Sequence, residues 1–185
     1  MTDAAQEGEE LVKELEPSNN VRQLTFGIAF HEDAFMNLST QVQKQAQHSN
    51  LGDKGVVGSI LLLPNAASVW IGWGSVNDVD CEIVGNKFPR RMGPMVVAFP
   101  RAYGGETSSS SLVGGENEED LVLATSMALR LTTKLSMPVY VACALQTWQE
   151  EENWMAGLDR EQVTQVAAAS AECRIRDLIR NFGHI

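Results

Sequence analysis

The sequence is poor in the residues from which catalytic and metal sites are usually built. It has three cysteines, Cys81, Cys143 and Cys173, which are widely spaced and include no C-x-x-C pair. This spacing indicates neither a disulfide framework nor a zinc site. Its three histidines are scattered as well, and an imidazole without an orienting partner offers no activated base. We therefore predict that the protein is not an enzyme and that it binds no metal and no cofactor.

Long apolar runs and positive charge are also scarce. No apolar run approaches the ~20 residues of a membrane-spanning helix, and the polar, acidic start of the chain lacks the layout of a signal peptide. The 14 Lys and Arg residues are outnumbered by 24 Asp and Glu residues, which leaves a formal charge of −10. Phosphate recognition needs clustered cations. We expect a cytoplasmic or nuclear protein that binds neither membranes nor nucleic acid.

Half of the net charge lies in the first twenty residues. Six acids stand there against Lys13 alone, which gives −5, and turn-forming residues close the segment at 17–20. A segment with so few aromatic and β-branched residues cannot bury enough apolar surface to fold. We predict a disordered acidic tail over residues 1–20, followed by one domain over residues 21–185.

Apolar patterns predict that the first half of this domain is rich in β-strands. Residues 21–30 alternate apolar and small or polar side chains, as a strand with one buried face requires. The apolar runs at 56–63 and 68–73 are separated by a short turn, which is typical of a β-hairpin. Residues 95–99 form another short run between two prolines. Residues 33–47 fit a strand that continues into a loop or a short helix, and the pattern does not decide between them.

Two helices are predicted in the second half. The first is capped by Asn117, carries acids in its first turn and repeats apolar residues at helical spacing up to Leu135. Pro138 stops it before an apolar strand over residues 139–145. The second begins at Asp159, with Gln162 at the position expected for a capping box, and runs to Phe182. Early strands and late helices predict an α+β fold in a single domain, with a mostly antiparallel sheet and two main helices packed on one side.

Between the strands and the helices lies a segment rich in glycine and serine. Residues 103–118 contain two Gly-Gly pairs and four consecutive serines. Such a composition buries little surface, so we predict a long mobile loop, interrupted at most near Leu112 and Val113.

Tryptophans and apolar helix positions are the remaining candidates for a binding surface, because tryptophan is common at interface hot spots. Trp70 alternates with Val69 and Ile71, so one side of that group must face outward unless both sheet faces are covered. A second chain could provide that cover. We predict that partner contacts involve Trp70 or Trp73 on this strand, or Leu121 or Leu131 on the helix that follows Asn117.

Three short motifs then carry a resemblance to a known family. They are Val69-Trp70-Ile71-Gly72, the end of the apolar strand at Ala144-Leu145-Gln146, and Ala171-Glu172-Cys173-Arg174-Ile175 in the last helix. In their order and spacing they resemble the proteasome assembly chaperone 4 family, over roughly residues 21–182. The acidic tail, a longer loop after residue 73 and an extended connection over 149–160 depart from the family pattern.

The resemblance implies a non-catalytic assembly chaperone that forms a heterodimer with a subunit of similar fold, proteasome assembly chaperone 3. Such a pair would bind α-type subunits of the 20S proteasome core particle and promote correct formation of the α-ring. Two alternatives remain open at this point. One is a protein-interaction adaptor of the profilin-like or trafficking type. The other is a small enzyme with a dispersed site, for example His31 with Cys143 or Glu172.

Overall fold

The computed structural model describes residues 21–30, 54–76, 92–101, 106–114, 117–146 and 159–182. These residues form six strands and two helices in the order β1 (Arg22–Ala29), β2 (Lys54–Leu63), β3 (Ala66–Ser75), β4 (Met95–Phe99), β5 (Ser108–Val113), α2 (Glu118–Leu135), β6 (Val139–Ala144) and α3 (Arg160–Phe182). The predictions for the acidic tail, for residues 33–47 and for the connection over 149–160 lie outside the described residues.

The six strands form one sheet in the order β1-β2-β3-β6-β4-β5. Strand β6 is parallel to β3, and every other neighbouring pair is antiparallel. The last strand in the sequence therefore lies inside the sheet, between β3 and β4. Five of its six residues are buried, and this interior position explains its continuous apolar sequence, because such a strand needs no polar side. The α+β prediction, with a mostly antiparallel sheet, is confirmed.

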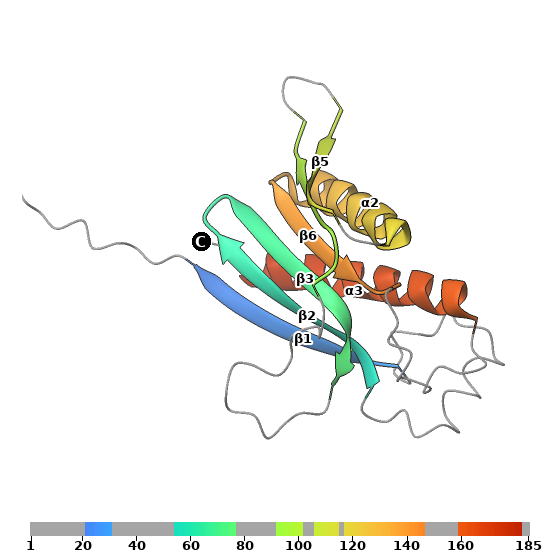
Figure 1. The fold of residues 1–185 in the computed structure, drawn as a ribbon. Helices are drawn as coiled ribbons and strands as arrows, with labels where there is room; N and C mark the ends of the chain where they lie inside the picture. The colour runs from blue at the N-terminus through green and yellow to red at the C-terminus, as the bar shows by residue number, and fades with distance from the viewer. Residues whose placement is uncertain are drawn as a thin grey trace, which may run out of the picture.

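Both helices lie on one face of the sheet, which is the far side in the view of Figure 1. Helix α2 contacts β6, β4 and β5, whereas α3 contacts β1, β2 and β3. The side chains beneath them alternate along each strand, as the pleat of a sheet requires. In β3, for example, Val69 and Ile71 are fully buried and Trp70 points to the opposite face, where it is half-buried. The alternation predicted around Trp70 is therefore confirmed.

The ends of both helices follow the local signals in the sequence. The Asn117 side chain accepts a hydrogen bond from the backbone N–H of Glu119 at 2.9 Å, which caps α2. At the other end Ser136 takes a left-handed conformation with φ 56°, and its N–H donates to the Thr132 carbonyl at 2.9 Å. Asp159 caps α3 by accepting from the N–H of Gln162 at 3.2 Å. Both predicted helix starts are confirmed.

One element contradicts the sequence prediction. Residues 108–113 were expected in a mobile loop, but they form strand β5, which pairs antiparallel with β4. All six residues are exposed, so side-chain burial does not hold this strand. Backbone hydrogen bonds to β4 do, and polar exposed side chains suit a strand at the edge of a sheet. The strand was not predicted because the composition of a segment indicates how much side-chain surface it can bury and says little about backbone pairing.

Candidate functional site

No group of catalytic residues is found in the described part of the chain. Cys143 is fully buried in β6, and burial is the main cause that raises the pKa of its thiol, with the charge of Asp120 acting in the same direction. A thiol held in its protonated form is a poor nucleophile. Among the described residues no group of three His, Cys, Asp or Glu side chains could hold a metal ion, and no helix is long and apolar enough to span a membrane. His31 lies outside them.

Glu172, the other residue considered for a dispersed active site, is fully engaged in ion pairs. Its side chain is only 7% exposed, and its two carboxylate oxygens lie 2.6 Å from Arg130 Nε and 2.7 Å from Lys134 Nζ. These pairs join α3 to α2. A carboxylate with both oxygens bound to cations is better placed to hold two helices together than to take a proton from a substrate.

Trp73, one of the predicted partner contacts, lies in the core. Its ring is 8% exposed and tilted against Phe30, with the ring centroids 6.5 Å apart. The indole N–H donates to the carbonyl of Leu145 at 2.7 Å, across 72 residues of sequence. The end of β6 is therefore fixed to β3 by a side-chain hydrogen bond.

The same end of β6 is held from the other side by a residue that the sequence analysis missed. Asp120 is fully buried in the first turn of α2, and its Oδ1 atom accepts from the N–H groups of Leu145 at 2.9 Å and Gln146 at 2.7 Å. Its neighbours Glu118 and Glu119 are exposed. Three consecutive acids at a helix start look alike in a sequence. Only their helical spacing relative to Ala124 could have shown which one faces inward.

The two leucines predicted as partner contacts also belong to the inner side of α2. Leu131 is fully buried in the core, and Leu121 is half-buried against it. The apolar face of this helix therefore packs mainly against the sheet of its own chain. Of the four predicted contact residues, Trp70 is the one whose side chain lies on the sheet face that neither of the described helices covers, and contact with a partner stays a prediction for all four.

The sheet face that carries Trp70 is a candidate binding surface. No helix of the described residues packs against it, and we call it the helix-free face. Leu61 and Phe99 on this face are 37% and 43% exposed, whereas Val57 and Val97, which the strand registers place on the same face, are buried. The strand registers place the larger exposed or half-buried side chains of this face near one another across β2, β3, β6 and β4: they are Leu61, Trp70, Met95, Phe99 and Tyr140. Half-exposed aromatic side chains of this kind are common at protein interfaces.

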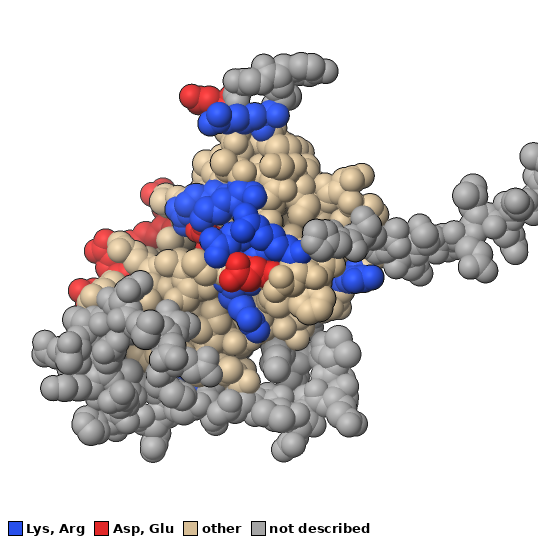
Figure 2. Space-filling model, turned by 180° about the vertical axis from the view of Figure 1, so that it is seen from behind, with Lys and Arg blue, Asp and Glu red and all other residues tan. Residues whose placement is uncertain are grey.

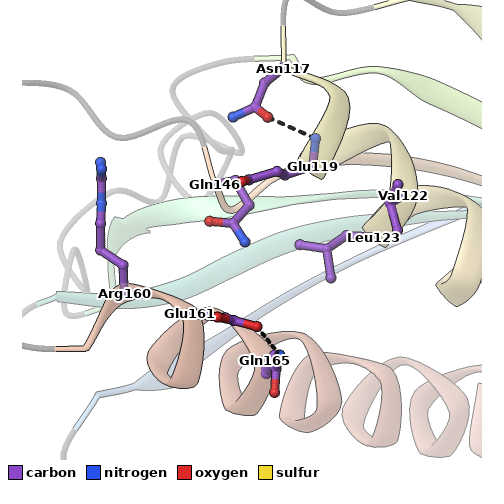
Figure 3. Close-up of a pocket in the computed structure, with 8 residues that line it drawn as sticks. All are labelled: Asn117, Glu119, Val122, Leu123, Gln146, Arg160, Glu161 and Gln165. Atoms are coloured by element: carbon purple, nitrogen blue, oxygen red, sulfur yellow. Dashed lines mark hydrogen bonds between the residues drawn. The ribbon is translucent and has the colours of Figure 1, made fainter.

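A hollow lies between the amino-terminal ends of α2 and α3 (Figure 3). It has a volume of about 730 Å³. On the α2 wall, Leu123 projects toward α3 and Val122 is 63% exposed. On the α3 wall, Glu161 accepts a hydrogen bond from Gln165 at 3.1 Å. Its other lining residues are Asn117, Glu119, Gln146 and Arg160. Asn117 and Glu161 each accept a hydrogen bond from another lining residue, and the lining residues include no nucleophile–base pair.

Comparison with known proteins gives two findings. The sequence profile described as proteasome assembly chaperone 4 matches residues 56–145. A chain in the crystal structure of a chaperone complex for yeast 20S proteasome assembly has a TM-score of 0.49 and 12% sequence identity to this chain, covering 88% of this chain and 97% of that one. No curated protein sequence matches.

The family match runs from β2 to the turn after β6. It therefore includes the strand of Trp70 with the first motif, the Asp120 and Trp73 hydrogen bonds to Leu145, and the first two residues of the second motif. The motif in α3 lies beyond the matched residues. The predicted resemblance is confirmed over residues 56–145, where this chain is similar to the proteasome assembly chaperone 4 family.

Proposed function

We propose that this protein is a non-catalytic chaperone of proteasome assembly that pairs with a chaperone subunit of similar fold and binds α-type subunits of the 20S core particle. The observation that carries the proposal is the family match over residues 56–145. The apolar helix-free face, as a candidate surface for a partner, supports the proposal. A chaperone of this kind acts by favouring one arrangement of neighbouring subunits over others.

The helix-free face is the surface we assign to pairing. Sheets that pack face to face bury apolar side chains from both inner faces, and this face presents Trp70, Tyr140 and Phe99. Burying half-exposed aromatic side chains supplies much of the affinity in such interfaces. A partner with a matching apolar sheet face would complete a two-layer core here, with helices on its outer sides.

The test is co-purification with a matched pair of substitutions. Tagged protein is recovered from its own cells at low salt, and bound chains are identified by mass. Trp70→Asp puts a charge on the helix-free face, whereas Val122→Asp puts the same charge on an exposed position of α2. We expect the wild type and Val122→Asp to recover a small partner chaperone together with α-type subunits, and Trp70→Asp to recover at least tenfold less partner.

Circular dichroism and thermal unfolding must show that Trp70→Asp remains folded. Absence of proteasome subunits from the wild-type preparation would contradict the assembly role and leave an interaction adaptor with another cargo. Equal recovery of the partner by a folded Trp70→Asp variant would remove the helix-free face from the pairing interface.

A further inference from the structure

The helix side of the molecule carries a concentration of positive charge that the proposed pairing does not use. It follows the seam between the carboxyl-terminal halves of α2 and α3. Arg130 and Lys134 from α2 converge on the buried Glu172 of α3, and Arg180 Nη2 reaches the carbonyl of Lys134 at 3.5 Å. Arg176 lies on the same helix, and its ion pair with Asp177 is 3.0 Å long. We call Arg130, Lys134, Arg176 and Arg180 the basic seam.

The basic seam opposes the overall charge of the chain. Its four cations stand beside two carboxylates, Glu172 and Asp177, which leaves a local charge of +2 in a chain of −10. The charge of Glu172 also helps to raise the pKa of Arg176, after the larger effect of Asp177. Figure 2 shows Lys and Arg side chains gathered near the middle of this side, with acidic side chains toward one flank.

Compensation of the helix dipoles accounts for only part of this charge. Cations at the carboxyl end of a helix interact with its dipole, but the effect is confined to the last turn. Lys134 and Arg180 lie in the last turns of α2 and α3, whereas Arg130 and Arg176 lie further in. The side chains of Arg130 and Lys134 remain 49% and 42% exposed although each binds Glu172. The buried carboxylate holds them in place and leaves donor groups facing solvent.

We propose that the basic seam binds a carboxylate-bearing segment of a partner protein. Arginine guanidinium groups bind carboxylates through two parallel hydrogen bonds, and here several of them face one strip of surface. A protein segment suits the seam better than nucleic acid, because a chain with a net charge of −10 repels a long polyanion while four clustered cations can bind a short acidic segment. The seam lies on the opposite side from the helix-free face, so both surfaces can be occupied together.

The test measures binding of a fluorescently labelled glutamate-rich peptide to the full chain at low salt, with the matching glutamine peptide as reference. Arg176→Gln combined with Arg180→Gln removes two cations and leaves both ion pairs of Glu172 in place, so the fold should be kept. The matched control is Arg22→Gln combined with Arg101→Gln, two exposed arginines outside the seam. We expect the seam variant to bind the glutamate peptide about tenfold more weakly and the control to bind like wild type.

Two outcomes with these proteins would overturn the proposal: wild type binds the two peptides equally, or the seam and control variants lose equal affinity. A third outcome needs a full-length variant in which the acids of residues 1–20 are changed to amides. The proposal would also be overturned if this variant bound the glutamate peptide more tightly than wild type. A tenfold gain in peptide affinity in that variant would mean that the chain's own acidic residues occupy the seam. The peptide assay contains no proteasome subunits. Its result therefore tests the basic seam separately from the proposed assembly role.

Discussion

Removal of the Asp120 carboxylate should be among the most damaging single changes in the described part of the chain. Its Oδ1 atom accepts from two backbone N–H groups at the end of β6, and the side chain is fully buried. Asp120→Ala leaves both N–H groups without this acceptor. Each unsatisfied buried N–H costs about 1–3 kcal/mol, so we expect a loss of about 3–5 kcal/mol. That is a large part of the 5–15 kcal/mol that is typical of a folded domain.

Asp120→Asn separates the two contributions of this side chain. Both hydrogen bonds end on one oxygen, and the single carbonyl oxygen of asparagine can accept both. The negative charge is lost while these two hydrogen bonds are kept, so the expected cost is smaller than for Asp120→Ala, at about 1 kcal/mol. Glu119→Ala removes a charge from the same helix turn at an exposed position and controls for the helix dipole.

The measurement is urea denaturation of the full chain, followed by tryptophan fluorescence. With a slope of about 2 kcal/mol/M, Asp120→Ala should lower the midpoint by about 2 M, and Asp120→Asn by about 0.5 M. Similar losses in the alanine and asparagine variants would refute the reasoning, because the charge would then matter more than the shared acceptor. A loss in Asp120→Ala no larger than that of Glu119→Ala would refute it as well.

Two further predictions concern the same part of the core. Trp73→Phe keeps an aromatic ring against Phe30 but removes the donor to the Leu145 carbonyl, so thermal unfolding should show a loss of about 1–2 kcal/mol; no loss would mean that water satisfies this carbonyl. For Cys143, the raised pKa means that the folded state keeps its proton while the unfolded thiol, near 9.0, loses it. Stability should therefore fall as pH rises above about 9, by up to about 1.4 kcal/mol per pH unit. Denaturation series of wild type and Cys143→Ala should show a shallower fall in the variant, and parallel curves would contradict the assignment.

The sequence predicted the elements whose causes are local. The Asn117 cap, the Asp159 cap and the alternation around Trp70 each depend on residues within a few positions of one another, and the structure confirms all three. Strand β5 was missed because its cause is pairing with β4, a backbone interaction to which four serines contribute no pattern.

The candidate sites were harder to predict because their parts come from distant positions. Glu172 meets Arg130 across 42 residues, and Asp120 meets Leu145 across 25. No periodicity links such pairs, so a buried acid cannot be distinguished from the exposed acids beside it. Leu131 illustrates the reverse problem, since an apolar helix position is equally compatible with a partner surface and with the core in which it lies.

The same long-range contacts bear on how the two proposed surfaces can be tested. Asp120 and Trp73 fix the end of β6, Thr132 donates from α2 to the Ala98 carbonyl of β4 at 3.2 Å, and Glu172 joins the two helices. Each of these contacts lies on the helix side of the sheet or between the helices, and none uses a side chain of the helix-free face. A substitution at Trp70 therefore leaves these four contacts of the core in place. Loss of pairing in a folded Trp70→Asp variant would consequently report on the surface itself, whereas the same loss after a change at Asp120 would report on the fold.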